Sequence, residues 1–241
     1  PAFIEIKEGR HPLVEVDFHR DFCINNHFIP NDTKLNQNRI VQLLTGPNAG
    51  GKSVYMKQVA LIVIMAHMGS FVPATEVKMS LFDNIYTSMN REDNIETGES
   101  SFIRQQKHID QEILPNASSK SLILMDEIGS GTSGYKDGGE ALASAFLLYI
   151  IREVKALTLF TTHFEYLPRL PSMLKIKTVK NFHPQKKRNG HSSFKIVTGK
   201  GVSDGIEAVE KSIPQFNPEV LDLSRQMRDI IQKLRHQTLK P

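Results

Sequence analysis

The sequence is poor in cysteine and has no tryptophan: Cys23 is its only cysteine in 241 residues. A single cysteine excludes an intramolecular disulfide and a cysteine-rich metal site, and it fits a reducing compartment best. The longest apolar run, residues 59–68, is far shorter than the roughly 20 residues that a membrane-spanning helix needs. We therefore expect a protein that does not span a membrane.

A strong charge of either sign is also absent, because the formal net charge is only +4. This mild basicity permits contact with nucleic acid without requiring it. The basic cluster at residues 186–188 lies in a stretch rich in Pro, Asn and Gly, which favours a solvated turn over a phosphate contact. The chain has no signal peptide and begins at Pro1 instead of methionine, so we expect a piece of a longer protein.

Strand and helix patterns alternate along the first 200 residues. Short apolar runs predict buried strands at residues 40–44, 84–87, 122–125 and 157–161. Helical periodicity lies between them, at residues 53–69, 101–114 and 138–152. This alternation predicts an α/β domain with a mostly parallel sheet and flanking helices.

The end of the chain has a different character. Residues 174–180 and 192–198 are interpreted as a hairpin around a turn at 184–191. From Gly205 a short helix, a break at Pro214 and an amphipathic helix follow. We therefore divide the chain into a domain at 1–200 and a helical element at 201–241.

Residues 45–53, Thr-Gly-Pro-Asn-Ala-Gly-Gly-Lys-Ser, match the phosphate-binding loop pattern G-x4-G-K-[ST]. The segment follows a predicted strand and opens a predicted helix, so backbone N–H groups and the helix dipole converge on phosphate oxygens. Lys52 would reach the β- and γ-phosphates, and the Ser53 hydroxyl would ligate Mg²⁺. The predicted ATP-binding residues are Gly46, Pro47, Asn48, Ala49, Gly50, Gly51, Lys52 and Ser53.

The apolar run 122–125 leads directly into Asp126 and Glu127. This places both carboxylates at the C-terminal end of a buried strand, where an open parallel sheet binds its ligand. Asp126 would hold Mg²⁺ through water, and Glu127 would orient or deprotonate the attacking water. The alternative is an ordinary acidic pair on the surface, which the loop some seventy residues upstream makes less favourable.

His163 follows the predicted strand 157–161. A histidine at a strand end is usually structural or exposed. Because this strand would neighbour the strand that carries the carboxylates, His163 is instead a candidate sensor of the γ-phosphate.

These elements, in their order and spacing, resemble the ATPase domain of the MutS family of DNA mismatch-recognition proteins. The resemblance covers essentially the whole chain. The motifs that carry it lie at residues 9–12, 45–53, 69–74, 99–102, 125–133, 161–164 and 201–205.

The resemblance implies a P-loop fold of the ABC-ATPase type, with a nucleotide site built from two subunits. Ser100 and Ser101 match the signature loop that approaches the γ-phosphate of the partner subunit, although a pair of hydroxyls before a helix is otherwise an N-cap. Phe28 matches the aromatic residue that stacks on adenine, and would otherwise be interpreted as core. The terminal helices, at 201–241, match a helix-turn-helix dimer contact.

The implied function is that of an Mg²⁺-dependent ATPase that acts on DNA as an ATP-gated dimeric clamp. Mismatched or branched double-stranded DNA would bind upstream domains, and the partner would be a second copy or another MutS homologue. Val54 and Phe71 favour the meiotic eukaryotic branch, the fifth homologue, whereas His163 fits mismatch-repair members equally well. The implied location is the nucleus, or the cytoplasm if the source is bacterial.

The sequence is compatible with two alternative functions. Ser130 stands where the family usually has Arg or Lys, which leaves open a nucleotide-gated scaffold with little turnover. An ABC-type transporter subunit needs an LSGGQ-like signature before the carboxylate strand, and residues 99–102 read Glu-Ser-Ser-Phe instead.

Overall fold

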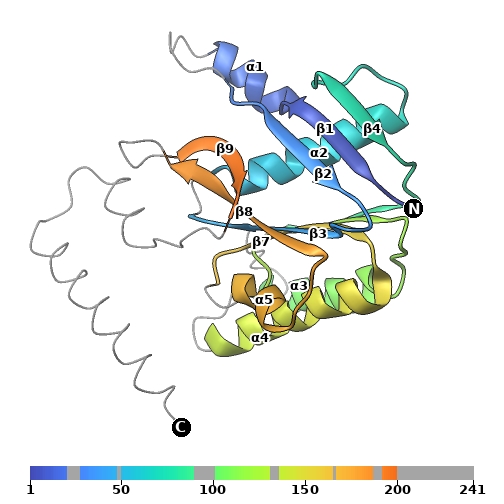
Figure 1. Ribbon diagram of the computed structural model, residues 1–241, viewed down its shortest axis with the longest axis vertical. Coiled ribbons are helices and arrows are strands. Elements are labelled where there is room, and N and C mark those ends of the chain that lie inside the picture. Colours follow the sequence, from blue (N-terminus) through green and yellow to red (C-terminus); the bar gives the residue numbers. More distant parts are fainter. Residues whose placement is uncertain are drawn as a thin grey trace, which may run out of the picture. The chain divides into compact units, whose positions relative to one another are not determined.

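The computed structural model describes residues 1–20, 28–47, 50–89, 101–130, 136–164, 167–186 and 192–199. Within these residues, two β-sheets enclose helix α2 (Lys52–His67), and further helices cover the outer face of the larger sheet (Figure 1). The predicted element at 201–241, including its helix-turn-helix, lies outside the described residues.

The central sheet has six strands in the order β5-β6-β7-β3-β8-β9. Its strands are β3 (Val41–Thr45), β5 (Ile85–Ser88), β6 (Leu122–Met125), β7 (Leu157–Thr162), β8 (Val179–Lys186) and β9 (Ser192–Thr198). All neighbouring pairs are parallel except β8 and β9, which are antiparallel. The prediction of an α/β fold with a mostly parallel sheet is therefore confirmed.

Strand β6, in the interior of the sheet, is wholly apolar because both of its faces are buried. In β6, Leu122 and Leu124 pack toward α2, whereas Ile123 and Met125 pack toward the helices on the opposite face. All four side chains are fully buried. The continuous apolar run that predicted this strand thus reflects its two-sided burial.

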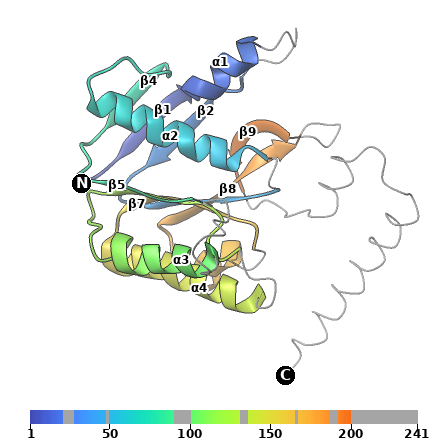
Figure 2. The ribbon, with the colours of Figure 1, turned by 180° about the vertical axis from the view of Figure 1, so that it is seen from behind.

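The helices cover both faces of the central sheet. Figure 2 shows α3 and α4 together on the face opposite α2. The remaining helical elements, with their bounds, are α1 (Pro12–Arg20), α3 (Ser101–Lys107), α4 (Lys136–Tyr149) and α5 (Leu170–Met173). Helix α3 continues as a π-helical segment, His108–Ile113, helix α4 continues as another, Ile150–Val154, and a 3₁₀ turn, Leu167–Arg169, leads into α5. No described helix is long and apolar enough to cross a lipid bilayer.

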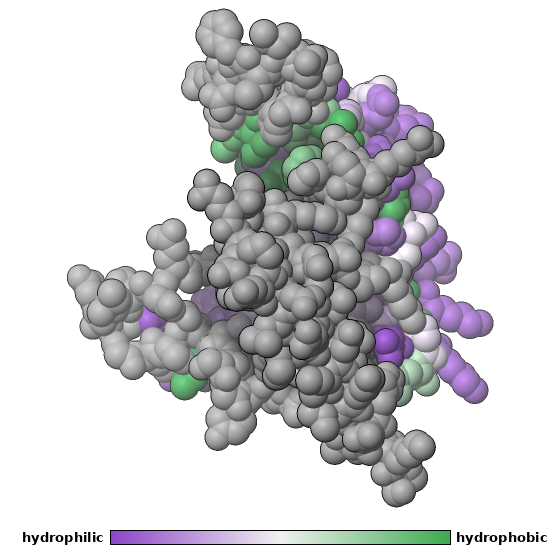
Figure 3. Space-filling model, turned by 90° about the vertical axis from the view of Figure 1, so that its left-hand side faces the viewer, coloured by the Kyte–Doolittle hydropathy of each residue, from purple (hydrophilic) through white to green (hydrophobic). Residues whose placement is uncertain are grey.

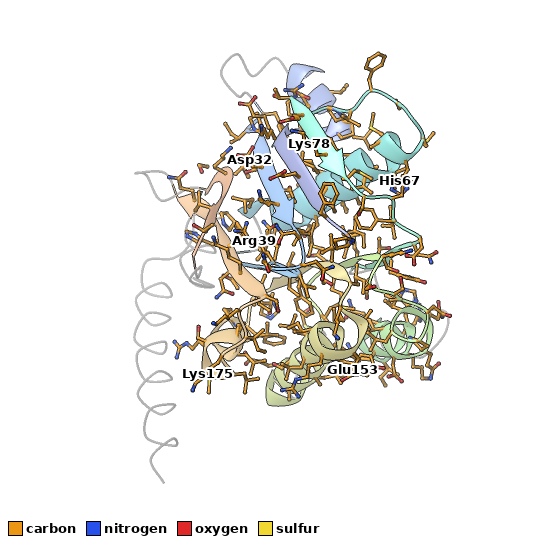
Figure 4. All side chains as sticks on the ribbon, turned by 45° about the vertical axis from the view of Figure 1, so that its right-hand side comes forward. Asp32, Arg39, His67, Lys78, Glu153 and Lys175 are labelled. Atoms are coloured by element: carbon orange, nitrogen blue, oxygen red, sulfur yellow. The ribbon has the colours of Figure 1, made fainter. Side chains whose placement is uncertain are left out.

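A second sheet, which the sequence did not predict, is antiparallel and has the order β2-β1-β4. Its strands are β1 (Ile4–Gly9), β2 (Asn31–Leu35) and β4 (Glu76–Met79). One face packs on α2, and the other carries ion pairs of Glu76 with Lys7 and Lys78. These hydrogen-bonded ammonium groups lower the pKa of Glu76 to about 2. Asp32 and Lys78 lie at this sheet and Glu153 lies in the helical layer across the central sheet (Figure 4).

The late hairpin differs from its predicted bounds. Its first arm begins at Val179 and not at residue 174, because the chain there is completing the turn after α5. The Leu174 N–H donates to the Leu170 carbonyl, and Lys175 takes a left-handed conformation with φ 54°. The arm also extends beyond Pro184, which was predicted to start the turn. Pro184 is accepted because the β8–β9 register shifts between Pro184 and Lys186.

Candidate nucleotide site

Helix α2, which follows the predicted phosphate-binding loop, is fixed between the two sheets by one buried tyrosine. The Tyr55 hydroxyl lies 2.8 Å from the Thr33 hydroxyl of β2 and accepts a hydrogen bond of 2.9 Å from the Gln42 amide of β3. Burial raises the pKa of Tyr55 to about 12, so the hydroxyl stays neutral. The start of α2 therefore has a defined position at the C-terminal end of β3.

The loop between β3 and α2 needs glycine at three positions. Gly46 and Gly51 have φ values of 145° and 84°, which residues with side chains rarely adopt. A Cβ at Gly46 or Gly50 would lie 2.9 or 2.8 Å from Pro184 of β8, and one at Gly51 would lie 3.1 Å from Phe194 of β9. The loop backbone is thus closely covered on one side by the β8–β9 hairpin.

Lys52 is the first residue of α2 and is only 1% exposed. Its ammonium group donates hydrogen bonds to the carbonyls of Gly46, at 2.7 Å, and Pro47, at 2.9 Å. Burial lowers the pKa of Lys52, and the charges of Glu127 and Asp126 oppose that effect. Phosphate oxygens carry negative charge, so they would bind this buried ammonium group more strongly than the neutral carbonyls do.

The acidic pair lies at the same edge of the sheet. Glu127 Oε1 is 3.6 Å from Lys52 Nζ, which joins the end of β6 to the loop after β3. Asp126 is 7% exposed. The Glu127 backbone is left-handed, with φ 50°, so the chain leaves the strand direction at this residue.

Sequence reasoning missed a third residue at this position, Thr161 of β7. Its hydroxyl donates to Asp126 Oδ1 at 2.5 Å and accepts the Glu127 N–H at 2.9 Å. The pairing register of the parallel strands identifies this residue, because Met125 of β6 pairs with Phe160 of β7. Thr161 is therefore the β7 residue that neighbours Asp126.

Ser130 stabilises the turn that follows the acidic pair. Its hydroxyl donates to the Glu127 carbonyl at 2.6 Å, and its N–H reaches the same oxygen at 3.2 Å. The residue that replaces the usual basic group therefore has a structural contact of its own.

His163 lies just after β7, and in the sheet order β7 stands between the carboxylate strand β6 and the loop strand β3. Its ring is half-buried and lies 4.8 Å from the Phe164 ring, centroid to centroid. Its role as a sensor of the γ-phosphate stays a prediction.

The other predicted residues lie at the ends of the described ranges or outside them. Phe28 is partly buried at the start of a described range, and Ser101 is the first residue of α3. Asn48, Ala49 and Ser100 lie outside the described residues. Their contacts with adenine or with a partner subunit remain predictions.

A magnesium ion would find oxygen donors at this edge. The Ser53 hydroxyl follows Lys52 on α2, and the Asp126 carboxylate lies at the end of β6. Hydroxyl and carboxylate oxygens are ligands that Mg²⁺ prefers, with water and phosphate oxygens completing its octahedral shell. The donor chemistry therefore fits Mg²⁺ bound together with a nucleotide.

Comparison with known families decides the assignment. The profile of MutS domain V matches residues 42–231, most of the chain. The chain belongs to the MutS family. Domain V of MutS proteins is a P-loop ATPase, in agreement with the mostly parallel sheet, and nucleotide binding is a property of that domain.

Bacterial and mammalian MutS proteins are among the relatives. The DNA mismatch repair protein MutS of Clostridioides difficile is 38% identical over 213 residues, which cover 88% of this chain and 20% of the relative. The MutS protein of Bacillus subtilis is 37% identical over 99% of the chain and 26% of its own length. The DNA mismatch repair protein Msh3 of Mus musculus is 36% identical over 98% of the chain and 21% of its own length. The chain thus spans a fifth to a quarter of these MutS relatives.

Proposed function

We propose that this chain binds ATP with Mg²⁺ at residues 46–53 and hydrolyses it to ADP and phosphate, as domain V of a MutS homologue. The observation that carries the proposal is the 3.6 Å separation of Lys52 Nζ and Glu127 Oε1. This contact supports the proposal because Lys52 would bind phosphate and Glu127 would activate water at the same edge of the sheet.

Binding would rest on the loop and on the start of α2. The Lys52 ammonium, which donates to the Gly46 and Pro47 carbonyls, would instead donate to β- and γ-phosphate oxygens. Helix α2 has 16 residues, so its N-terminus contributes unpaired N–H groups and a favourable dipole. Phe28 would contact the adenine.

Ser53 and Asp126 would hold Mg²⁺, Asp126 through water. When bound, the ion neutralises charge on the β- and γ-phosphate oxygens. Glu127 would orient the attacking water and accept its proton. Lys52 would stabilise the charge that develops on the phosphate oxygens, and His163 would sense the γ-phosphate from the end of β7.

In the longer protein, we propose that this ATPase gates a dimeric clamp on DNA. The names of the relatives, which are DNA mismatch repair proteins, support a role in that process. A homodimer or a heterodimer with another MutS homologue would complete each site with Ser100 and Ser101 of the partner chain. Domains outside this chain would bind mismatched or branched DNA. Val54 and Phe71 favour the meiotic branch of the family, and membership of that branch would imply branched DNA and a meiotic role.

A second candidate function is a nucleotide-gated scaffold that binds ATP with little turnover. Ser130 favours it, because its hydroxyl is used by the Glu127 carbonyl and supplies no positive charge to the site. Single-turnover hydrolysis, measured beside equilibrium binding of a non-hydrolysable ATP analogue, separates the two functions. The ATPase converts all bound ATP in one turnover, whereas the scaffold retains it.

The proposed site is tested by Lys52→Ala. This change removes the only side-chain cation that we assign to the β- and γ-phosphates, so affinity for the analogue should fall about tenfold or more, as expected for a lost hydrogen-bonded charge. Isothermal titration measures the affinity. Lys57→Ala is the matched control, because Lys57 is exposed on the same helix. Unchanged affinity of Lys52→Ala would place the nucleotide elsewhere.

A further inference from the structure

The Thr161 hydroxyl bridges the two acidic residues of the proposed site. It donates its hydrogen to Asp126 Oδ1 at 2.5 Å and accepts the Glu127 N–H at 2.9 Å. A hydroxyl has one donor hydrogen and two acceptor lone pairs, so both bonds form at once. Thr161 is fully buried, so these bonds are protected from competing water.

Strand register explains why the bridge forms at this residue. Asp126 still follows the sheet on one side, where its N–H donates to the Ser88 carbonyl of β5 at 2.8 Å. The next residue, Glu127, has a left-handed backbone with φ 50°, so the chain leaves the strand here. The Thr161 side chain supplies the acceptor for the Glu127 N–H.

We propose that Thr161 is a positioning residue that sets both carboxylates for catalysis. Its donated hydrogen bond fixes the orientation of the Asp126 carboxylate, which would hold Mg²⁺. Its accepted bond holds the left-handed backbone at Glu127, whose carboxylate contacts Lys52. The inference rests on the proposed ATPase function, and it adds a residue that touches neither nucleotide nor metal.

Replacing Thr161 with valine keeps the shape of the side chain and removes both hydrogen bonds. Asp126 then loses a charge-assisted donor, and the Glu127 N–H loses its acceptor at a partly buried position. The loop at residues 46–53 is unchanged, so ATP affinity should be retained. The turnover number should fall about tenfold or more, and the Mg²⁺ concentration for half-maximal rate should rise.

The chain offers a matched control on the same strand. Thr158 is also a fully buried threonine of β7, and its hydroxyl donates to the Ala156 carbonyl at 3.0 Å, at the opposite end of the strand. Thr158→Val therefore removes a buried hydroxyl without touching the acidic pair. Thr161→Ser is the conservative variant, because it keeps the bridging hydroxyl.

The experiment compares these variants in steady-state ATP hydrolysis with Mg²⁺ titration. We expect a turnover loss for Thr161→Val with unchanged KM for ATP, recovery to near wild type in Thr161→Ser, and wild-type turnover in Thr158→Val. Wild-type turnover and Mg²⁺ dependence in Thr161→Val would overturn it. Equal losses in Thr161→Val and Thr158→Val would also overturn it, because they indicate a general effect of the strand.

A second measurement works without hydrolysis. In chain labelled with ¹⁵N-glutamate, the Glu127 amide can be assigned by its loss in Glu127→Gln, and its hydrogen exchange reports the bond to Thr161. Exchange should accelerate about tenfold or more in Thr161→Val and stay slow in Thr161→Ser. Unchanged exchange in Thr161→Val contradicts the positioning role. If wild-type chain fails to hydrolyse ATP while the exchange differs as expected, the ATPase proposal fails and the bridge stands.

Discussion

At the scale of single residues, His11 shows how burial fixes a protonation state. Its Nδ1 accepts the N–H groups of Leu13, at 3.3 Å, and Val14, at 3.2 Å, so the imidazole caps the start of α1 in its neutral form. Burial lowers the pKa of His11, and the charge of Lys57 lowers it further. Protonation would remove the acceptor and with it the cap.

This residue gives a pH prediction. Because the folded pKa lies below that of the unfolded chain, the unfolded state binds more protons between the two values. The stability that His11 contributes is complete above about pH 6.5 and is lost as the pH falls through the lowered folded pKa. His11→Asn keeps a capping oxygen and does not titrate, so its stability should fall less than that of wild type on acidification.

Urea unfolding of both proteins on either side of about pH 6.5 measures the difference. His11→Ala should lose about 1 kcal/mol at neutral pH, where Asn retains the cap. Identical pH dependence in wild type and His11→Asn would show that His11 does not contribute.

At the scale of elements, the loop before α2 packs against the β8–β9 hairpin, and its glycines are required for two different reasons. One is the lack of space for a Cβ, and the other is a positive φ. Gly50 would clash with Pro184 if it carried a Cβ, at 2.8 Å, whereas Gly46 has both a close approach to Pro184, at 2.9 Å, and a φ of 145°. A side chain at Gly50 therefore meets only a steric clash, whereas one at Gly46 also meets backbone strain.

We therefore expect Pro184→Ala to rescue Gly50→Ala and to leave Gly46→Ala impaired. Each single glycine change should cost about 1–3 kcal/mol of stability, by overpacking at Gly50 and also by backbone strain at Gly46. Thermal unfolding of the single and double variants provides the comparison. Equal rescue of both glycine variants would show that the backbone conformation of Gly46 has no separate cost.

The elements also show what could be predicted from the sequence. Strands β3, β5, β6 and β7 were predicted to within about a residue. The signal is strongest in β6, where two-sided burial produces a continuous apolar run. The antiparallel sheet was missed because β1 pairs with β4, some seventy residues away, and polar residues such as Asp32 and Lys34 interrupt β2. Its pairing depends on contacts that no local pattern contains.

The site also contains both residues that local motifs predict and residues that only long-range contacts bring into place. Lys52 and Glu127 belong to local motifs, and the structure brings them together at 3.6 Å. Thr161, Pro184 and Phe194 meet the site through strand register and the hairpin, and their identities carry no local signal. The turn of the hairpin was predicted to start too early because Pro184 is typical of turns, although a register shift accommodates it within β8.

At the scale of the whole molecule, the described surface is mixed in polarity. The face in Figure 3 carries hydrophilic residues along one edge and a smaller apolar area near its upper end. The chain spans only a fifth to a quarter of the length of its MutS relatives. The proposed dimer is tested by the dependence of ATP hydrolysis on protein concentration.

If the active site is shared between two subunits, specific activity should rise with protein concentration. A Ser100→Ala, Ser101→Ala double variant should bind ATP and hydrolyse it poorly. An excess of Lys52→Ala chain should restore activity, because the mixed dimer contains one complete site. A dilution series followed by mixing tests this. Constant specific activity down to nanomolar protein, with no rescue, would mean that each chain holds a complete site.

The most direct test of the central claim is single-turnover hydrolysis by Glu127→Gln at saturating ATP and Mg²⁺. The glutamine keeps the size of the side chain and removes its basicity. We predict analogue affinity close to that of wild type and a hydrolysis rate lower by about a hundredfold or more, the usual loss when one general base is removed. Hydrolysis by Glu127→Gln at the wild-type rate would contradict the assignment of Glu127 and with it the proposed mechanism.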